Sequence, residues 1–199
     1  MSRLPLSHYV PHLTGVAIGM ALSTLILPMP KLLLWNASAS APTGLYAINP
    51  LRKPAVGDMV AVTPPLALGR IMAQRHYLPI GVPLLKHVAA RPGALICRRD
   101  TAVTIDGRRV AMARPADSHG RPLPVWRGCR VLRDGELFLL NPAPDSFDGR
   151  YFGAVPATGL LGRATPILTR DTPHTPLRWR GGRACSAHSI TPEGDVPCR

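Results

Sequence analysis

Aromatic residues, acidic residues and lysine are all scarce in this chain of 199 residues. Aromatic residues make up only 5% of it, which argues against a surface of stacked rings for single-stranded nucleic acid. Charged residues make up only 18% and hydrophobic residues 46%, which excludes a chain that is disordered throughout. Proline (23) and glycine (18) are abundant but follow no Gly-X-Y period, so collagen is excluded. The length fits one domain with appendages.

The charge balance is strongly basic, because 24 lysine and arginine residues face 11 acidic ones, for a formal net charge of +13. This charge is compatible with nucleic acid or an anionic membrane as a partner, and also with a coding bias toward arginine. Lysine occurs only at Lys31, Lys53 and Lys86, and every other cation is an arginine. A lysine inside an apolar segment is therefore informative, since arginine is the default cation of this chain.

An uncharged segment near the N-terminus is predicted to be a membrane anchor. Residues 9–30 contain no lysine, arginine or acidic residue, and their number is close to the ~20 residues that a helix needs to cross a bilayer. We interpret residues 1–34 as a signal anchor with a transmembrane helix. The alternatives are a secretory signal peptide cleaved near Ala37-Ser38-Ala39 and a buried helix of a soluble domain. An anchor would place the rest of the chain outside the cytoplasm.

Residues 35–169 read as a mainly β domain. Short apolar runs alternate there with turns rich in glycine, proline and aspartate, and no long helical period follows the anchor. Asp106-Gly107 is a strong hairpin signal, because it joins two such runs and suits a tight two-residue turn. Many short strands with regular turns predict a barrel-like domain. The expected strands are 59–62, 71–73, 84–90, 103–105, 109–111 and 137–140. Residues 170–199 are polar and rich in arginine, proline and glycine, which indicates a flexible basic tail.

Two serines directly after the apolar segment are candidate nucleophiles. Ser38 and Ser40 lie among alanines, and small neighbours would let the backbone of a substrate approach a reactive hydroxyl. Pro42 and Gly44 fix a turn just beyond them. The alternative is a plain Ser/Ala linker beside an anchor, and composition alone favours that linker.

Lys86 lies inside the apolar run 84–90, where a general base is chemically feasible. Burial disfavours the ammonium form of a lysine, whereas an arginine keeps its proton. A neutral amine can take the proton of a serine hydroxyl. The alternative is an edge lysine on a half-exposed strand. The adjacent His87 faces the other way on a strand, and the chain has no Gly-x-Ser-x-Gly elbow, which disfavours a Ser-His-Asp triad.

A third segment, residues 141–153 (NPAPDSFDGRYFG), completes an ordered set of motifs. Taken alone, it fits a surface turn as well as a loop that positions another loop. The set comprises Ser-x-Ser-x-Pro after an apolar segment, Leu-Lys-His-Val-Ala-Ala-Arg-Pro-Gly, and Ser-Phe-Asp-Gly-Arg-Tyr-Phe-Gly. It resembles the signal peptidase I-like Ser/Lys peptidases. Residues 36–46 are similar to the Asn-x-Ser/Thr-x-Ser-x-Pro-x-Gly-Leu-Tyr of their conjugal-transfer branch, the TraF-type pilin-processing peptidases.

The resemblance extends to about residue 168 and implies roles for five residues within a signal peptidase-like β-barrel domain. Ser40 matches the nucleophile and Lys86 the general base. The Ser38 hydroxyl matches a donor that would form the oxyanion hole together with the Ser40 N–H group. Asp148 and Arg150 match the supporting turn, and their implied role is structural.

Several positions depart from ordinary signal peptidases. Ala41 follows the implied nucleophile where those enzymes have methionine. Leu140-Asn141-Pro142 replaces their Gly-Asp-Asn, and Gly149 stands where the family often has serine. The first two departures favour the conjugal branch, and the last weakens the argument for additional polar support around Lys86.

The implied function is a membrane-anchored serine endopeptidase that cleaves a pilin or another exported precursor during conjugative transfer. An acyl-enzyme would be resolved by water or by the N-terminus of the substrate itself, which would give a cyclic product. We expect a polypeptide substrate, no cofactor, no metal and no requirement for nucleic acid. The expected location is the bacterial inner membrane, with the catalytic domain on the periplasmic side. The alternative is a noncatalytic, membrane-tethered β domain that binds pilus or transfer-apparatus components through its basic surface.

Four cysteines, without a CxxC pair, allow three disulfide pairings. Cys97 and Cys129 lie in the predicted domain, where export would let a disulfide persist, and we expect these two to pair. Four residues near the C-terminus are candidate metal ligands, but their spacing matches no standard zinc site; they are His174, Cys185, His188 and Cys198.

Overall fold

The structure is a computed structural model that describes residues 9–26, 33–51, 53–172 and 174–181. The chain divides into two compact units, residues 1–31 and 32–199. The first unit contains one helix, α1 (Tyr9–Ile26). Within the described residues, no helix is both long enough and apolar enough to cross a membrane, so the transmembrane helix expected in residues 1–34 is not found among them.

The second unit is mainly β, as the sequence predicts. Its larger sheet has eight antiparallel strands in the order β1-β2-β11-β3-β4-β9-β10, with β12 paired to β11. A second sheet has the order β7-β6-β5-β8. The larger path ends at β1 and at β10 without pairing them, so the described strands form an open sheet and not the closed barrel that we expected. The elements are β1 (Leu33–Asn36), β2 (Thr43–Asn49), β3 (Met59–Val62), α2 (Leu66–Gln74), β4 (Leu84–Ala90), β5 (Leu95–Arg99), β6 (Ala102–Ile105), β7 (Arg108–Met112), β8 (Gly128–Val131), β9 (Glu136–Leu140), α3 (Gly149–Phe152), β10 (Ala154–Pro156), a 3-10 turn (Ala157–Gly159), β11 (Leu160–Arg170) and β12 (Arg178–Trp179).

Burial patterns separate the outer strands from the central ones. Along β2, buried and half-buried residues alternate, as in a strand with one face on the core. All four residues of β3 and all seven of β4 are buried, because both faces of these strands are covered. The lysine that the sequence singled out, Lys86, therefore lies in one of two strands whose residues are all buried.

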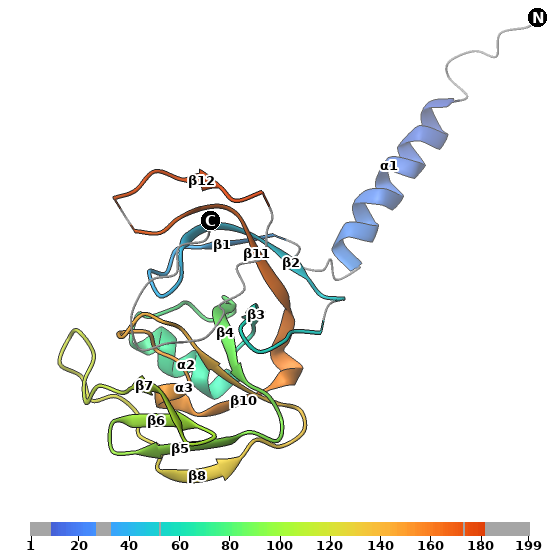
Figure 1. The fold of residues 1–199 in the computed structure, drawn as a ribbon. Helices are drawn as coiled ribbons and strands as arrows, with labels where there is room; N and C mark the ends of the chain where they lie inside the picture. The colour runs from blue at the N-terminus through green and yellow to red at the C-terminus, as the bar shows by residue number, and fades with distance from the viewer. Residues whose placement is uncertain (1–8, 27–32, 52, 173, 182–199) are drawn as a thin grey trace, which may run out of the picture. The chain divides into compact units, whose positions relative to one another are not determined.

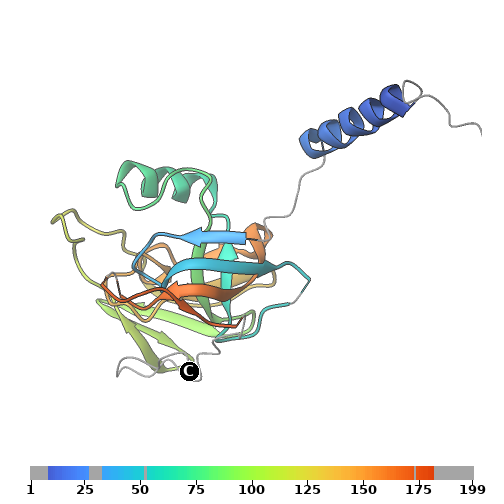
Figure 2. The same cartoon turned by 90° about the horizontal axis from the view of Figure 1, so that it is seen from above.

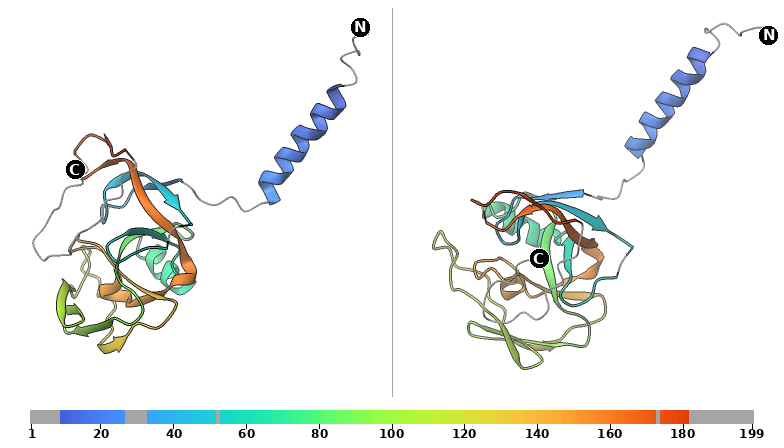
Figure 3. Two further views of the ribbon diagram at one scale, coloured as in Figure 1. Left: turned by 45° about the vertical axis from the view of Figure 1, so that its right-hand side comes forward. Right: turned by 45° about the horizontal axis from the view of Figure 1, so that its top comes forward.

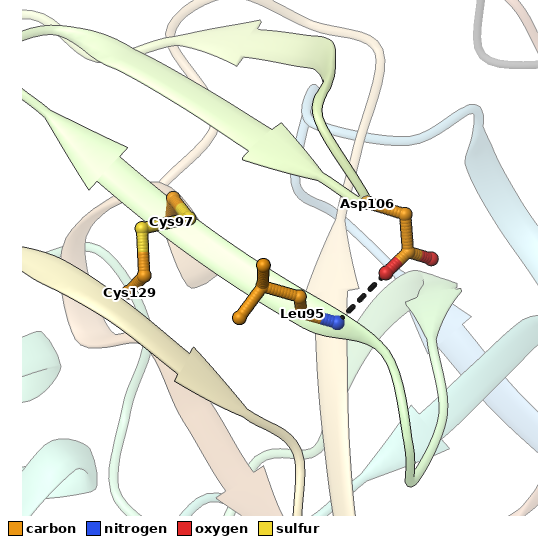
Figure 4. Close-up of a disulfide and its surroundings, with 4 residues drawn as sticks. All are labelled: Leu95, Cys97, Asp106 and Cys129. Carbon is orange, nitrogen blue, oxygen red and sulfur yellow. Dashed lines mark hydrogen bonds between the residues drawn. A yellow bond between two sulfur atoms is a disulfide. The ribbon is translucent and has the colours of Figure 1, made fainter.

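The small sheet confirms two predictions from the sequence. Asp106 and Gly107 join β6 to β7, and both have positive φ, 47° and 79°, as a tight hairpin turn requires. Cys97 of β5 and Cys129 of β8 face each other in the ladder and form a disulfide, which Figure 4 shows beside the hydrogen bond from Leu95 N to Asp106 Oδ1. Figures 1 and 3 show this sheet at the end of the domain away from β1 and β12.

One predicted strand is wrong. Residues 71–73 belong to α2, which begins after Pro64-Pro65. Three apolar residues are too few to distinguish a strand from a helix. Met72 is buried while Ile71 is partly exposed, so this helix presents one face to the core. In the view of Figure 2, α2 and the small sheet lie on opposite sides of the larger sheet's strands.

Part of the segment interpreted as a basic tail is ordered against the domain. Arg178 and Trp179 form β12, which pairs with Thr169 and Leu168 of β11. The Arg180 Nη2 atom lies 2.6 Å from Asp171 Oδ1, which forms an ion pair. Residues 182–199, with Cys185 and Cys198, lie outside the described residues.

Reduction of the Cys97–Cys129 disulfide is expected to destabilise the domain. The bond closes a loop with a sequence separation of 32, for which the chain-entropy relation gives about 3–4 kcal/mol, equivalent to a fall in Tm of roughly 10 °C. Thermal melts with and without a thiol reductant measure this. The variant Cys97→Ala/Cys129→Ala should melt near the Tm of reduced wild type in both buffers. A fall in its Tm on adding reductant as large as that of wild type would contradict the assignment.

Candidate active site

The structure brings Ser40 and Lys86 together, although 46 residues separate them in sequence. Ser40 lies in the loop between β1 and β2, and Lys86 is in the middle of β4. The Lys86 Nζ atom lies 3.3 Å from the Ser40 Oγ atom and donates a hydrogen bond to it. This is the arrangement that the transfer of a proton between a serine and a lysine requires.

The serine loop is shaped by a buried amide, Asn36, at the end of β1. Its Nδ2 atom donates to the carbonyl oxygens of Ser38, Ala41 and Pro42 at 2.9, 3.1 and 3.0 Å. Its Oδ1 atom accepts from the Ser38 N–H group at 3.0 Å. One side chain thus satisfies several backbone groups of the loop, which a free Ser/Ala linker would leave to water.

Two further residues hold the far end of this loop. The Tyr46 hydroxyl donates to the Pro42 carbonyl oxygen at 2.7 Å. Gly44 has a φ of +140°, and a Cβ atom there would lie 2.1 Å from the Leu168 carbonyl oxygen. Glycine is required because β11 passes this close to the backbone.

Lys86 is 2% exposed, and the Nζ atom also donates to the Ser146 Oγ atom at 2.7 Å. The pKa of Lys86 is lowered from 10.5 to about 8, chiefly by burial; within that net shift Asp148 and Asp145 act to raise the pKa and Arg150 acts to lower it. A useful fraction of this amine is therefore neutral near physiological pH, so that it can act as a base.

Ser38 lies beside the reactive hydroxyl. Its Oγ atom is 3.1 Å from Ser40 Oγ and accepts from the Ser40 N–H group at 3.4 Å. The two groups expected to form an oxyanion hole are thus adjacent beside the Ser40 hydroxyl, with the N–H group directed at the Ser38 Oγ atom.

Asp148 and Arg150 form a buried ion pair that shapes the loop after β9. Asp148 is fully buried and Arg150 is 3% exposed, and the Nη2–Oδ2 distance is 3.0 Å. Arg150 also donates to the carbonyl oxygens of Asn141, Ala143 and Pro144. The loop wraps around the guanidinium, and this fixes the position from which Ser146 reaches Lys86.

The contribution of Ser146 was not predicted from the sequence. The motif containing it was recognised, but nothing in its spacing shows that this hydroxyl faces Lys86 from 60 residues away. Gly149 stands where the family often has serine, and the structure gives a steric reason for this glycine. A Cβ atom at Gly149 would lie 2.7 Å from the Leu139 carbonyl oxygen, so a serine there would collide with β9.

A cavity of about 250 Å³ opens onto Ser38, Ser40 and Lys86. Its wall is largely apolar, with side chains from α2, β4, the loop before β8, the loop after β9 and α3; they are Met72, Leu84, Leu123, Phe147 and Tyr151. Such a lining suits a polypeptide substrate with apolar side chains. A larger cavity, of about 440 Å³, beside Pro64 and Pro65 has no titratable residue in its lining, and is therefore a weaker candidate for chemistry.

Two alternatives from the sequence find no support at this site. His87 does not line the cavity; its Nδ1 atom lies 3.0 Å from the Gly57 carbonyl oxygen, and burial lowers its pKa. Among the described residues, no group of three histidine, cysteine or acidic side chains is arranged to hold a metal ion. Three of the four residues considered for a metal lie outside the described part of the chain; they are Cys185, His188 and Cys198.

Comparisons with known proteins identify the family to which this chain is similar. The family model described as "Signal peptidase, peptidase S26" matches residues 7–169. The conjugal transfer protein TraF of Agrobacterium fabrum is 39% identical over 146 residues, covering 68% of this chain and 82% of the relative. A plasmid transfer protein TraF of Escherichia coli is 29% identical over 147 residues, covering 67% of this chain and 81% of the relative.

Among solved structures, a signal peptidase I from Enterococcus faecalis matches with 21% identity and a TM-score of 0.34, over 56% of this chain and 97% of that one. The family assignment does not depend on that likeness, because the family model spans most of the chain and the Agrobacterium relative matches over most of its own length. The chain belongs to the signal peptidase family, peptidase S26, as a TraF-type member.

Proposed function

We propose that the chain is a serine endopeptidase that cleaves an exported precursor, such as a pilin, during conjugation, with Ser40 as nucleophile and Lys86 as general base. The observation that carries this proposal is a deeply buried lysine 3.3 Å from a serine hydroxyl. A lysine that needed only to be a cation would be solvated, and arginine is the commoner cation of this chain.

The first half of the reaction forms an acyl-enzyme. Neutral Lys86 takes the proton of the Ser40 hydroxyl while Oγ attacks the scissile carbonyl carbon. The Ser38 hydroxyl and the Ser40 N–H group donate to the oxyanion that develops. When the tetrahedral intermediate collapses, the protonated Lys86 gives its proton to the leaving amine. The ester of Ser40 and the free amine product result.

In the second half, a nucleophile attacks this ester and Lys86 accepts the proton of that nucleophile. The bond between Ser40 Oγ and the acyl carbon then breaks, and Lys86 returns the proton to Ser40 Oγ. Water gives a linear product. The N-terminal amine of the same substrate forms a new peptide bond and closes a ring, so that one peptide bond replaces the one that was cleaved. We propose the cleavage step for this chain and leave both outcomes as products to be distinguished by mass, because the linear product is heavier by one water.

The proposed location of the domain is the periplasmic side of the inner membrane. The support for export is the Cys97–Cys129 disulfide, since structural disulfides persist in oxidising compartments such as the periplasm. An exported catalytic domain would meet its precursor as the latter emerges from the membrane.

Loss of either Ser40 or Lys86 is expected to abolish processing. Ser40→Ala removes the nucleophile, and Lys86→Ala removes the base, so each should reduce product to the background level. The measurement is mass spectrometry of a co-expressed candidate pilin, after thermal melts show that the variants are folded. Lys53→Ala is the matched control, because Lys53 is exposed, and it should process normally. Normal processing by both active-site variants would show that the assignment of Ser40 and Lys86 is wrong. A pilin left intact by folded wild type would favour the noncatalytic binding domain.

The rate should depend on pH through Lys86. Its pKa is lowered to about 8, and only the neutral amine accepts a proton, so kcat/KM should increase about tenfold per pH unit below pH 8 and level off above it. Processing rates of purified enzyme from pH 6 to pH 10 test this. A plateau that already begins below pH 7 would assign the base to another group.

Ser38→Ala should lower kcat by about 10²–10³-fold while changing KM little, because the lost donor acts on the transition state. Ser38→Thr keeps a hydroxyl and should retain most of the activity. Steady-state rates on the same precursor compare the two. An equal loss in both variants would point to a role for the serine in loop packing.

A further inference from the structure

The side chain of Asn141 connects the residue that carries the hydroxyl to the strand that carries the amine. Asn141 directly follows β9 and is 3% exposed. Its Nδ2 atom donates to the Ser40 carbonyl oxygen at 2.8 Å and to the Leu85 carbonyl oxygen at 3.1 Å. Its Oδ1 atom accepts from the His87 N–H group at 3.3 Å. Both N–H groups and the oxygen of one amide are thus engaged.

The contacts on β4 flank Lys86 on both sides. β4 and β9 pair as far as His87 and Leu140, so the ladder ends one residue before Asn141. The amide then bonds the next backbone groups of β4 that face β9, which continues the ladder with a side chain. Ser40 is held by the same nitrogen that holds Leu85. The separation of Ser40 and Lys86 is therefore set through one planar group.

The backbone of Asn141 is itself anchored to the buried ion pair. The Asn141 N–H group donates to Asp148 Oδ2 at 3.0 Å, and Arg150 donates to the Asn141 carbonyl oxygen. The Asp148–Arg150 ion pair is thus connected to the site by two routes. One leads through Ser146 to the Lys86 amine, and the other leads through Asn141 to the loop that carries Ser40.

We propose that Asn141 is a positioning residue for acyl transfer, which holds the Ser40 hydroxyl within reach of the Lys86 amine. This role rests on the peptidase function proposed above. Asn141 does not line the cavity beside Ser40, so it acts on the geometry of the reacting groups and not on substrate binding. An aspartate in this chain would lose both Nδ2 contacts, because each of them needs a donor.

The test uses full-length wild type, Asn141→Asp and Asn141→Ala, assayed on the candidate pilin. Asn141→Asp has nearly the same shape but gives no N–H group to either carbonyl oxygen. Both variants should lower kcat by about 10–100-fold, as misplacement of reacting groups does, with KM within about twofold of wild type. The pH midpoint of Asn141→Ala should stay near that of wild type, since alanine adds no charge near Lys86. Asn49→Asp is the matched control, because Asn49 is exposed and its Oδ1 atom accepts from the Leu51 N–H group. The kcat of this variant should equal that of wild type.

Three outcomes are informative. Wild-type kcat in both variants would overturn the positioning role. A lower Tm with an unchanged kcat per mole of folded enzyme would also overturn it, because it would show a purely structural contribution. Wild type that processes no precursor while it is folded would instead overturn the proposed peptidase function, and with it the role of Asn141.

Discussion

The burial of Lys86 is the constraint on which the rest of the site depends. An ammonium group removed from water loses solvation, and the folded chain compensates with the hydroxyls of Ser40 and Ser146. Both hydroxyls can donate to a neutral amine or accept from a charged one. The surroundings therefore tolerate both protonation states of Lys86, which a base that must gain and lose a proton in each cycle requires.

The loops around Lys86 are ordered from inside by amides and one guanidinium. Asn36 fixes the serine loop, Arg150 fixes the loop after β9, and Asn141 joins that loop to β4. Each group offers several donors to carbonyl oxygens that would otherwise be buried without partners. Removing one member of such a network leaves the others unsatisfied, at about 1–3 kcal/mol for a neutral group and more for the buried pair.

The sequence predicted local features better than long-range ones. Strands such as 59–62 and 84–90 and the Asp106-Gly107 hairpin were predicted from local signals. The Cys97–Cys129 pair was predicted because both cysteines lie in the domain expected to be exported. Ile71 was placed wrongly, because a short apolar run fits both a helix and a strand. The contacts of Ser146 and Asn141 with β4 could not be predicted, since they span 60 and 56 residues and depend on how β9 pairs with β4. Closure of the barrel likewise depends on the pairing of distant strands.

The chemistry of the site carries a cost in stability that the fold must offset. Lowering the Lys86 pKa from 10.5 to about 8 makes the folded state less stable by about 3 kcal/mol wherever the amine is protonated. That cost is fully present below pH 8, and it disappears as the pH rises from 8 toward 10.5, because the unfolded chain still binds the proton in that range. The Cys97–Cys129 disulfide contributes about 3–4 kcal/mol in the chain-entropy account, from a sheet that holds none of the reacting groups. Stability that the disulfide supplies away from the site thus offsets the cost of the lowered Lys86 pKa, which its proposed role as a base requires.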